Sequence, residues 1–278
     1  MGIIEAIVLG IIEGITEFLP VSSTGHLTIA EKLLGQSIND PAVTAFTAVI
    51  QIGAIAAAIV FLRKDIVRII TGWVRGVFMP ALRTTQDYKF GWAVILGSIP
   101  IAVIGLLFKD QIETTLRSLW FVAIALIGWS AVMWAADKYA TTRKREDQTT
   151  WRDTVIIGFV QCIALIPGVS RSGATISAGL FRGFDRVAAT RLSFFLGIPA
   201  LVAAGALEAV TKASDISSGV GWPATIVATV VSFIVAYLSI AWLLKYVARH
   251  TFKLFIVYRI VVGVLLIVLL ATGTIAST

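Results

Sequence analysis

Charged residues and cysteines are both scarce in this sequence. Only 14% of the 278 residues are charged and 58% are hydrophobic, whereas soluble domains carry about 25% charged residues. This composition excludes an ordinary water-soluble globule, and no polar stretch is long enough for a separate soluble domain. The single cysteine, Cys162, has no partner, which excludes a disulfide framework and a thiolate metal cluster.

Apolar stretches are what the sequence has in abundance. A membrane span needs about 20 mostly apolar residues, and six stretches meet this need: 42–62, 90–108, 119–136, 189–210, 223–244 and 254–274. Two shorter stretches, 3–19 and 154–166, carry polar residues and run into clusters of Pro, Gly and Ser. Each predicts a re-entrant helical hairpin. Non-helical backbone at membrane depth is tolerated only where it is buried in protein or lines a cavity, so we expect a site there.

The basic residues predict the orientation in the membrane. If the hairpins do not cross, 17 of the 23 Lys and Arg residues lie in loops on one side. Four lie on the other side: Lys32, Lys109, Arg117 and Lys212. The positive-inside rule assigns the richer side to the cytoplasm, so both termini and the mouth of the first hairpin face outward. This bias accounts for the net charge of +7, and we expect no nucleic-acid partner.

The chain contains an internal repeat. A shift of 148 residues aligns GIIEGITEFLPVSSTG (10–25) with GFVQCIALIPGVSRSG (158–173), with five identities. The two halves, 1–136 and 153–278, are joined by a cytoplasmic linker at 137–152, and each holds one hairpin and three spans. Because three is odd, the second half is inverted, an arrangement whose sites lie near the midplane at broken helices. The sequence therefore predicts one all-α integral membrane domain with an inverted-topology repeat.

The first hairpin carries a cluster of polar residues. Glu13 and Glu17 are four residues apart and project from one face of a helix. Carboxylates in an apolar segment cost about 2.5–3.5 kcal/mol each, which indicates a function. The polar residues that follow Pro20 are Ser22, Ser23, Thr24 and His26. The second hairpin lacks both glutamates and has Arg171 between Ser170 and Ser172.

These residues favour phosphoryl chemistry. The guanidinium of Arg171 suits a phosphate, and a Ser-rich turn that opens a helix offers N–H groups to an anion. Because glutamates repel an anion, we expect a divalent cation, Mg²⁺ or Ca²⁺, held by Glu13, Glu17 and phosphate oxygens. The candidates for phosphate binding are Ser22, Thr24, Ser170, Arg171 and Ser172. The candidates for catalysis are Glu17, Ser23 and His26: Ser23 or an activated water attacks, and Glu17 or His26 handles the proton.

Two segments, EGITEFLPVSSTGH (13–26) and PGVSRSGAT (167–175), resemble the signature motifs of the bacterial undecaprenyl-diphosphate phosphatase family, of the UppP or BacA type. The resemblance implies a multi-pass enzyme of the bacterial plasma (inner) membrane. Such an enzyme converts undecaprenyl diphosphate into undecaprenyl phosphate, the lipid carrier recycled for peptidoglycan synthesis. It also implies a divalent cation, an active site open to the outer, periplasmic side, and bacitracin resistance, because the antibiotic competes for the polyprenyl diphosphate substrate.

Several alternatives stay open at this stage. A lipid-phosphate or proton-coupled transporter or flippase shares the inverted-repeat architecture, and the glutamates could form its proton relay. Arg171 could simply pair with Glu13 or Glu17, and the Ser and Thr residues could serve only as helix caps. Arg259 could reach the headgroups or pair internally. The native metal, the preferred prenyl chain length and the oligomeric state, with a homodimer among the options, are not decided by sequence.

Overall fold

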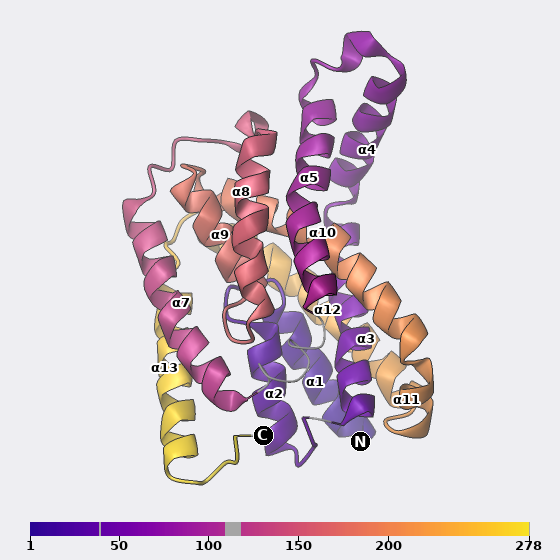
Figure 1. Ribbon diagram of the computed structural model, residues 1–278, viewed down its shortest axis with the longest axis vertical. Coiled ribbons are helices and arrows are strands. Elements are labelled where there is room, and N and C mark those ends of the chain that lie inside the picture. The colour runs from indigo at the N-terminus through magenta and orange to yellow at the C-terminus, as the bar shows by residue number, and fades with distance from the viewer. Residues whose placement is uncertain (39, 109–117, 278) are drawn as a thin grey trace.

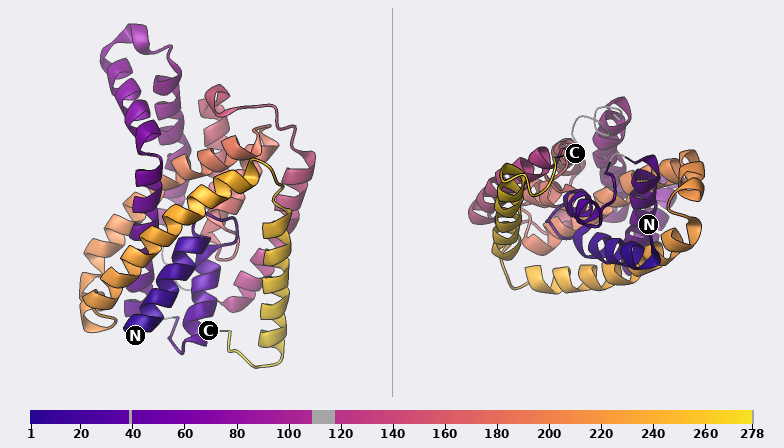
Figure 2. Two further views of the ribbon diagram at one scale, coloured as in Figure 1. Left: turned by 180° about the vertical axis from the view of Figure 1, so that it is seen from behind. Right: turned by 90° about the horizontal axis from the view of Figure 1, so that it is seen from below.

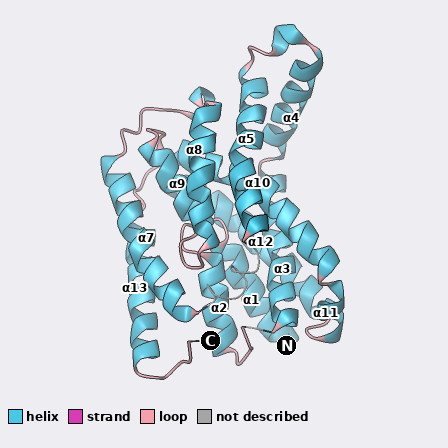
Figure 3. Cartoon of the chain, in the orientation of Figure 1, coloured by secondary structure: helices cyan, strands magenta, loops and turns pink. Residues whose placement is uncertain are grey.

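The computed structural model describes residues 1–38, 40–108 and 118–277, and within these ranges the chain is helical with no β-strand (Figures 1 and 3). The α-helices are α1 (Ile3–Thr16), α2 (Ser23–Leu33), α3 (Pro41–Phe61), α4 (Arg63–Phe78), α5 (Gln86–Leu107), α7 (Leu119–Tyr139), α8 (Trp151–Gln161), α9 (Arg171–Phe181), α10 (Arg186–Thr211), α11 (Ala213–Ser218), α12 (Trp222–Val247) and α13 (Lys253–Ala271). Short 3₁₀ turns lie at Pro80–Leu82, Glu146–Gln148 and Cys162–Leu165.

Six of these helices, α3, α5, α7, α10, α12 and α13, are long and apolar enough to cross a membrane. They coincide with the six predicted spans, with ends that differ by up to four residues. The chain is therefore a multi-pass membrane protein. Helix α4 was not predicted, and it stands with the start of α5 above the rest of the molecule (Figure 1).

Two helix pairs, α1–α2 and α8–α9, pack against the spans. The pair α1–α2 occupies the end of the molecule where both chain termini lie, and the pair α8–α9 descends from the opposite end (Figures 1 and 2). The connecting segments, 17–22 and 162–170, meet in the middle, and we call them the first and second tips. The loops rich in Lys and Arg lie at the end opposite the termini. Lys109 and Arg117 lie outside the described residues.

The two tips turn in the same way. Ser22 and Ser170 precede α2 and α9 with φ angles of 79° and 78°, in a region that residues other than glycine rarely adopt. The hydroxyl of Ser22 accepts a hydrogen bond from the N–H of Gly25 at 3.3 Å, and that of Ser170 accepts one from Gly173 at 3.1 Å. Each serine thus caps the next helix. Because the two serines are 148 residues apart, the internal repeat aligns positions of equal backbone conformation.

Glycines set how closely each pair packs against the spans. A Cβ at Gly10 of α1 would lie 2.6 Å from the carbonyl oxygen of Ala228 on α12. A Cβ at Gly158 of α8, the aligned residue, would lie 2.0 Å from the carbonyl oxygen of Gly97 on α5. Small residues permit such contact between membrane helices. The first pair therefore packs on a span of the second half, and the second pair on a span of the first half.

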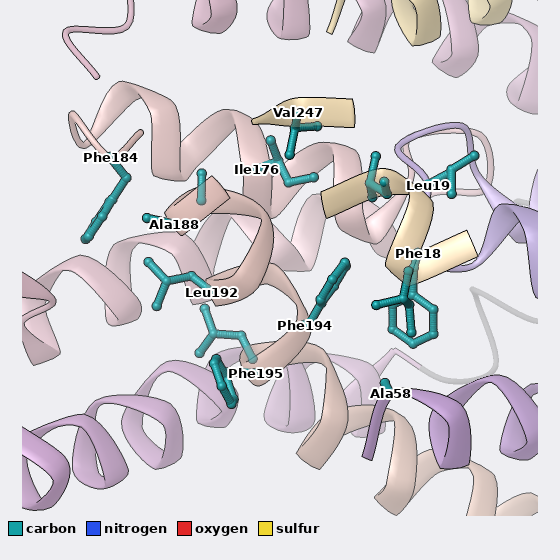
Figure 4. Packing of buried hydrophobic residues seen from close by; sticks show 14 of the residues in the cluster. Phe18, Leu19, Ala58, Ile176, Phe184, Ala188, Leu192, Phe194, Phe195 and Val247 are labelled. Carbon is teal, nitrogen blue, oxygen red and sulfur yellow. The ribbon is translucent and has the colours of Figure 1, made fainter. Parts of the chain in front are cut away.

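The main hydrophobic core anchors the first tip (Figure 4). The ring of Phe18 meets the ring of Phe194 on α10 edge to face, with centroids 5.2 Å apart, a favourable geometry for aromatic pairs. Leu19 and Ala58 belong to the same buried cluster. The tip is thus held by packing on α10 and α3, although it is irregular backbone.

Candidate active site

Glu17 is the centre of a hydrogen-bonded group at the first tip. Its Oε2 accepts a hydrogen bond from the hydroxyl of Ser23 at 2.6 Å and another from Nε2 of Gln51 at 3.3 Å. Its Oε1 lies 3.3 Å from Nη2 of Arg171. Glu17 is 5% exposed, so this ion pair is shielded from bulk water and stronger than a surface pair. The structure therefore joins a carboxylate, a hydroxyl and a guanidinium from both tips.

Arg171 is held in place by the backbone of α10. Its Nη1 donates to the carbonyl oxygen of Ser193 at 2.9 Å, and its guanidinium lies over the ring of Phe18, 5.7 Å from the centroid. Gly197 leaves the space that the guanidinium fills, because a Cβ there would lie 2.1 Å from Nη1. The buried Nε has no hydrogen-bond partner among the described residues. Arg171 is thus oriented by protein and keeps one N–H donor available.

Glu13 faces a small polar chamber next to this group. The chamber has a volume of about 220 Å³. Its lining residues are Glu13, Ser23, Thr24, Leu27, Thr28, Glu31, Thr44, Thr47, Ala48, Gln51 and Glu208. Oε1 of Glu13 is buried and has no hydrogen-bond partner among the described residues. A buried carboxylate oxygen without a donor is costly, and a cation or a bound ligand would satisfy it.

His26 points away from Ser23, toward α13. Its Nδ1 lies 2.8 Å from the carbonyl oxygen of Ser22, and its Nε2 lies 2.8 Å from the hydroxyl of Tyr258. A carbonyl can only accept, so Nδ1 carries the proton and, in the neutral ring, Nε2 accepts from Tyr258. The two rings also stack, with centroids 5.5 Å apart. In this arrangement His26 fixes the turn at Ser22 and does not contact Ser23.

Two predicted phosphate ligands, Ser22 and Ser172, connect the two tips, and a third, Ser170, lies next to Ser172. The hydroxyl of Ser22 accepts from the N–H of Gly168 at 3.2 Å, and the hydroxyl of Ser172 donates to the carbonyl oxygen of Leu19 at 2.8 Å. Ser170 lies 3.1 Å from Ser172, hydroxyl to hydroxyl. All three serines are buried. Of the predicted phosphate ligands, Thr24 lines the polar chamber and Arg171 lies beside it at Glu17.

The sequence is similar to known proteins over nearly its whole length. The family model described as bacitracin resistance protein BacA matches residues 6–265. The chain belongs to the BacA family. It is 63% identical over 278 residues to undecaprenyl-diphosphatase 3 of Frankia casuarinae, and the match covers 100% of both chains. It is 57% identical over 284 residues to the undecaprenyl-diphosphatase of Cutibacterium acnes, again over 100% of both. Undecaprenyl-diphosphatase 1 of Streptomyces avermitilis is 54% identical over 273 residues, 98% of each chain.

Arg259 binds both tips of this BacA-family chain from α13. It is fully buried. Its Nη1 donates to the carbonyl oxygen of Pro20 in the first tip at 3.3 Å, and its Nη2 donates to that of Gly168 in the second tip at 2.9 Å. Further bonds go to Ser130 and to the carbonyl oxygen of Ala125. The guanidinium therefore pairs internally, and it satisfies carbonyl groups that the broken helices leave without partners.

A second, apolar cavity is bordered by Arg171. It has a volume of about 490 Å³, lies between α5 and α10, and is lined mostly by aliphatic residues. Arg171 and Glu208 are the charged residues in its wall, and Glu208 also lines the polar chamber. An apolar cavity that ends at a guanidinium suits the junction between a hydrocarbon tail and an anionic headgroup.

Sequence reasoning missed three residues of this site: Gln51, Ser193 and Tyr258. Gln51 is an amide within an otherwise apolar span, which is a signal that could have been used. Ser193 contributes a backbone carbonyl and Tyr258 a hydroxyl from a distant span, and neither carries a local sequence signal. Their roles depend on contacts between helices that only the folded chain shows.

Proposed function

We propose that this chain is an undecaprenyl-diphosphate phosphatase, which hydrolyses the terminal phosphate of undecaprenyl diphosphate and leaves undecaprenyl phosphate. One observation carries the proposal: the hydroxyl of Ser23, which lines the polar chamber, donates to Glu17, and Glu17 also pairs with Arg171. This arrangement supports Ser23 as the nucleophile, Glu17 as its base and Arg171 as the anion ligand. The names and full-length identity of the relatives support the same substrate.

In the first step, the hydroxyl oxygen of Ser23 attacks the terminal phosphorus and its proton passes to Glu17. The bond from phosphorus to the bridging oxygen breaks, and undecaprenyl phosphate leaves with that oxygen. Arg171 keeps its contact with the phosphate through the N–H that has no protein partner. In the second step, water attacks the phosphorus of phosphoserine 23, and the bond from phosphorus to the serine oxygen breaks. Glu17 returns its proton to that oxygen, and the free phosphate departs. A direct attack by water, with Ser23 orienting Glu17, is the competing route.

The residues present also fit a divalent cation. Glu13 lines the chamber and has a buried carboxylate oxygen without a hydrogen-bond partner among the described residues, and hard cations prefer oxygen ligands. Among the described residues no three His, Cys, Asp or Glu side chains are placed to share one ion. We therefore propose that Glu13 and Glu17 hold Mg²⁺ or Ca²⁺ together with oxygens of the diphosphate. When bound, the cation neutralises charge on the substrate.

We further propose that α1–α2 and α8–α9 are re-entrant hairpins of an inverted repeat. The equal turns at Ser22 and Ser170 support this, as does the exchanged packing through Gly10 and Gly158. The end rich in Lys and Arg then lies in the cytoplasm. The polar chamber, which extends toward Thr44 at the start of α3, opens to the outer side. Competition with bacitracin for the substrate follows from this exposure.

The test is phosphate release from undecaprenyl diphosphate by purified protein in detergent, with and without EDTA. Glu17→Gln and Arg171→Ala should each lower kcat by at least 10²-fold, because each removes a group at the reacting phosphate. Acid quenching followed by mass spectrometry should detect phosphoserine at position 23. Thr47→Val, which changes another polar residue of the chamber, is the matched control and should stay within threefold.

Three outcomes would refute parts of this proposal. Full activity in both Glu17→Gln and Arg171→Ala would discard the site. Retained activity in Ser23→Ala without any phosphoserine would favour the water route. If the intact protein releases no phosphate in detergent but moves lipid phosphates between leaflets, the chain is a carrier.

A further inference from the structure

A third cavity lies at the opposite end of the molecule from the polar chamber. It has a volume of about 960 Å³ and lies among the start of α5, the segment before α8 and the end of α9. Its lining residues are Gln86, Tyr88, Lys89, Trp92, Leu96, Lys144, Asp147, Gln148, Thr149, Thr150, Trp151, Arg152, Asp153 and Arg182. We call it the basic pocket. It shares no lining residue with the polar chamber or the apolar cavity, so the proposed reaction does not use it.

The floor of the basic pocket is an ion cluster around Asp153. The side chain of Asp153 is fully buried and pairs with Lys144 and, at 3.0 Å, with Arg182. Burial acts to raise the pKa of Asp153, but hydrogen bonds from Lys144, Thr150 and Arg182 outweigh it, and the pKa falls below its ordinary value of 3.8. Asp153 is therefore ionised at neutral pH. It offsets part of the charge of Lys144 and Arg182 and fixes the start of α8.

Two further cations in the pocket have no acidic partner. Lys89 on α5 and Arg152 on α8 are exposed, and neither forms an ion pair with any residue that the structure describes. The guanidinium of Arg152 lies over the ring of Trp151, 5.4 Å from its centroid. The pocket contains four cations and two carboxylates. It is therefore electropositive and complementary to an anion.

Tryptophan side chains also line this pocket, and aliphatic side chains border it. Trp92 and Trp151 line it and are 37% and 53% exposed, as is typical of indoles at a membrane surface. From Trp92, exposed side chains continue along α5 through Ile95 and Ile99. On α8 they continue from Trp151 through Ile156 and Phe159. Because Gly97 and Gly158 bring α5 and α8 into contact, the pocket adjoins two lipid-facing apolar stripes.

We propose that the basic pocket binds an anionic phospholipid of the cytoplasmic leaflet. Lys89 and Arg152 contact its phosphate, and its acyl chains lie on the stripes of α5 and α8. The indole rings and the stripes select a lipid over free phosphate, and the unpaired cations select an anionic lipid over a zwitterionic one. Basic pockets between membrane helices on the cytoplasmic side recognise headgroups in this way. The assignment rests on the orientation proposed above.

The test titrates purified protein in detergent with phosphatidylglycerol brominated on its acyl chains, which quenches nearby tryptophans. Brominated phosphatidylcholine is the neutral comparison. We expect saturable quenching by phosphatidylglycerol at concentrations at least tenfold below those needed for phosphatidylcholine. Lys89→Gln combined with Arg152→Gln should weaken binding of phosphatidylglycerol about 30-fold, since each cation near an anionic lipid contributes about 1 kcal/mol.

Matched variants separate this site from general charge effects. Lys245→Gln combined with Arg249→Gln removes the same charge from the cytoplasmic end of α12 and should leave the affinity unchanged. Lys89→Arg combined with Arg152→Lys keeps both charges and should bind within threefold of the native chain. If the double glutamine variant is not folded, the two single variants should each weaken binding about fivefold.

Three results would overturn the proposal. These are equal quenching by the two lipids, unaltered affinity in the glutamine variants, and an equal loss in the α12 control. Displacement of the lipid by millimolar inorganic phosphate would also overturn the proposal, because the pocket would then be a phosphate site. Glu17→Gln should bind phosphatidylglycerol normally, so failure of the proposed reaction and failure of this lipid site give different results.

Discussion

The substitution Gly197→Ala tests whether the position of Arg171 limits the reaction. A Cβ at residue 197 would lie 2.1 Å from Nη1 and 2.6 Å from Cζ of Arg171. Ordinary contact begins at 3.4 Å, so the guanidinium must move by about 1.3 Å. A movement of this size breaks the 2.9 Å bond to Ser193 and alters the 3.3 Å contact with Glu17.

The expected result is a catalytic defect in a folded protein. A misplacement of about 1 Å at a reacting group costs about 10²-fold in rate, so kcat for phosphate release should fall about 100-fold. Overpacking costs about 1–3 kcal/mol, so the Tm in detergent should fall by a few degrees only. Gly128→Ala in α7 is the matched control, because a Cβ there meets nothing within 4 Å. It should keep both kcat and Tm.

A double-mutant cycle identifies the cause of the defect. In an Arg171→Lys background there is no planar fork to collide with residue 197, so Gly197→Ala should cost less than tenfold there. An equal 100-fold cost in both backgrounds would trace the effect to the packing of α10. A kcat for Gly197→Ala within threefold of the native chain would refute the reasoning outright.

Three further predictions follow from contacts around the tips and the basic pocket. Arg259→Lys keeps the charge but cannot bind both tips, and each buried carbonyl left unsatisfied costs about 1–3 kcal/mol. We therefore expect a lower Tm and about tenfold lower activity. An unchanged Tm would contradict the role of Arg259 in joining the tips. Because the fold lowers the pKa of Asp153, its contribution to stability is complete above pH 3.8 and is lost as the pH falls through the lowered value. The difference in Tm between the native chain and Asp153→Asn should therefore be constant from neutral pH to about pH 5 and should narrow below pH 3.8. His26→Asn keeps a donor near Nδ1 for the carbonyl of Ser22 and should retain at least tenfold more activity than His26→Ala; equal inactivity of the two would make His26 the base.

The spans were predictable because lipid imposes a simple local rule. Each crossing helix needs an uninterrupted apolar run, and residues 42–62 and 254–274 are visible as such in the sequence. The positions of the two tips were also predictable, since Pro20 and Gly168 interrupt apolar segments with polar neighbours. Helix α4 was not predicted, because it alternates basic and apolar residues and is too polar to resemble a span. Its basic residues were assigned to a loop.

The candidate site was predictable in its residue types and less so in its contacts. Glu13, Glu17 and Arg171 were singled out because charge in an apolar segment is costly. The sequence could not show that Ser22 and Ser172 bond to the opposite tip, or that His26 turns toward Tyr258. Nor could it decide between the two roles considered for Arg259. These contacts join residues at least 91 positions apart, so no local pattern records them.

The exchanged packing of the two halves has a consequence for the order of synthesis. Helix α1 packs on α12, whose last residue, Val247, is made more than 200 residues after the end of α2 at Leu33. At about 5–20 residues per second, a bacterial ribosome needs on the order of ten to forty seconds to bridge that interval. During this time the amino-terminal segment of the nascent chain, with its two carboxylates, cannot pack on α12. Such a nascent chain depends on a temporary binding partner in the membrane. If the chain is cut between the two halves, neither fragment should be stable without the other.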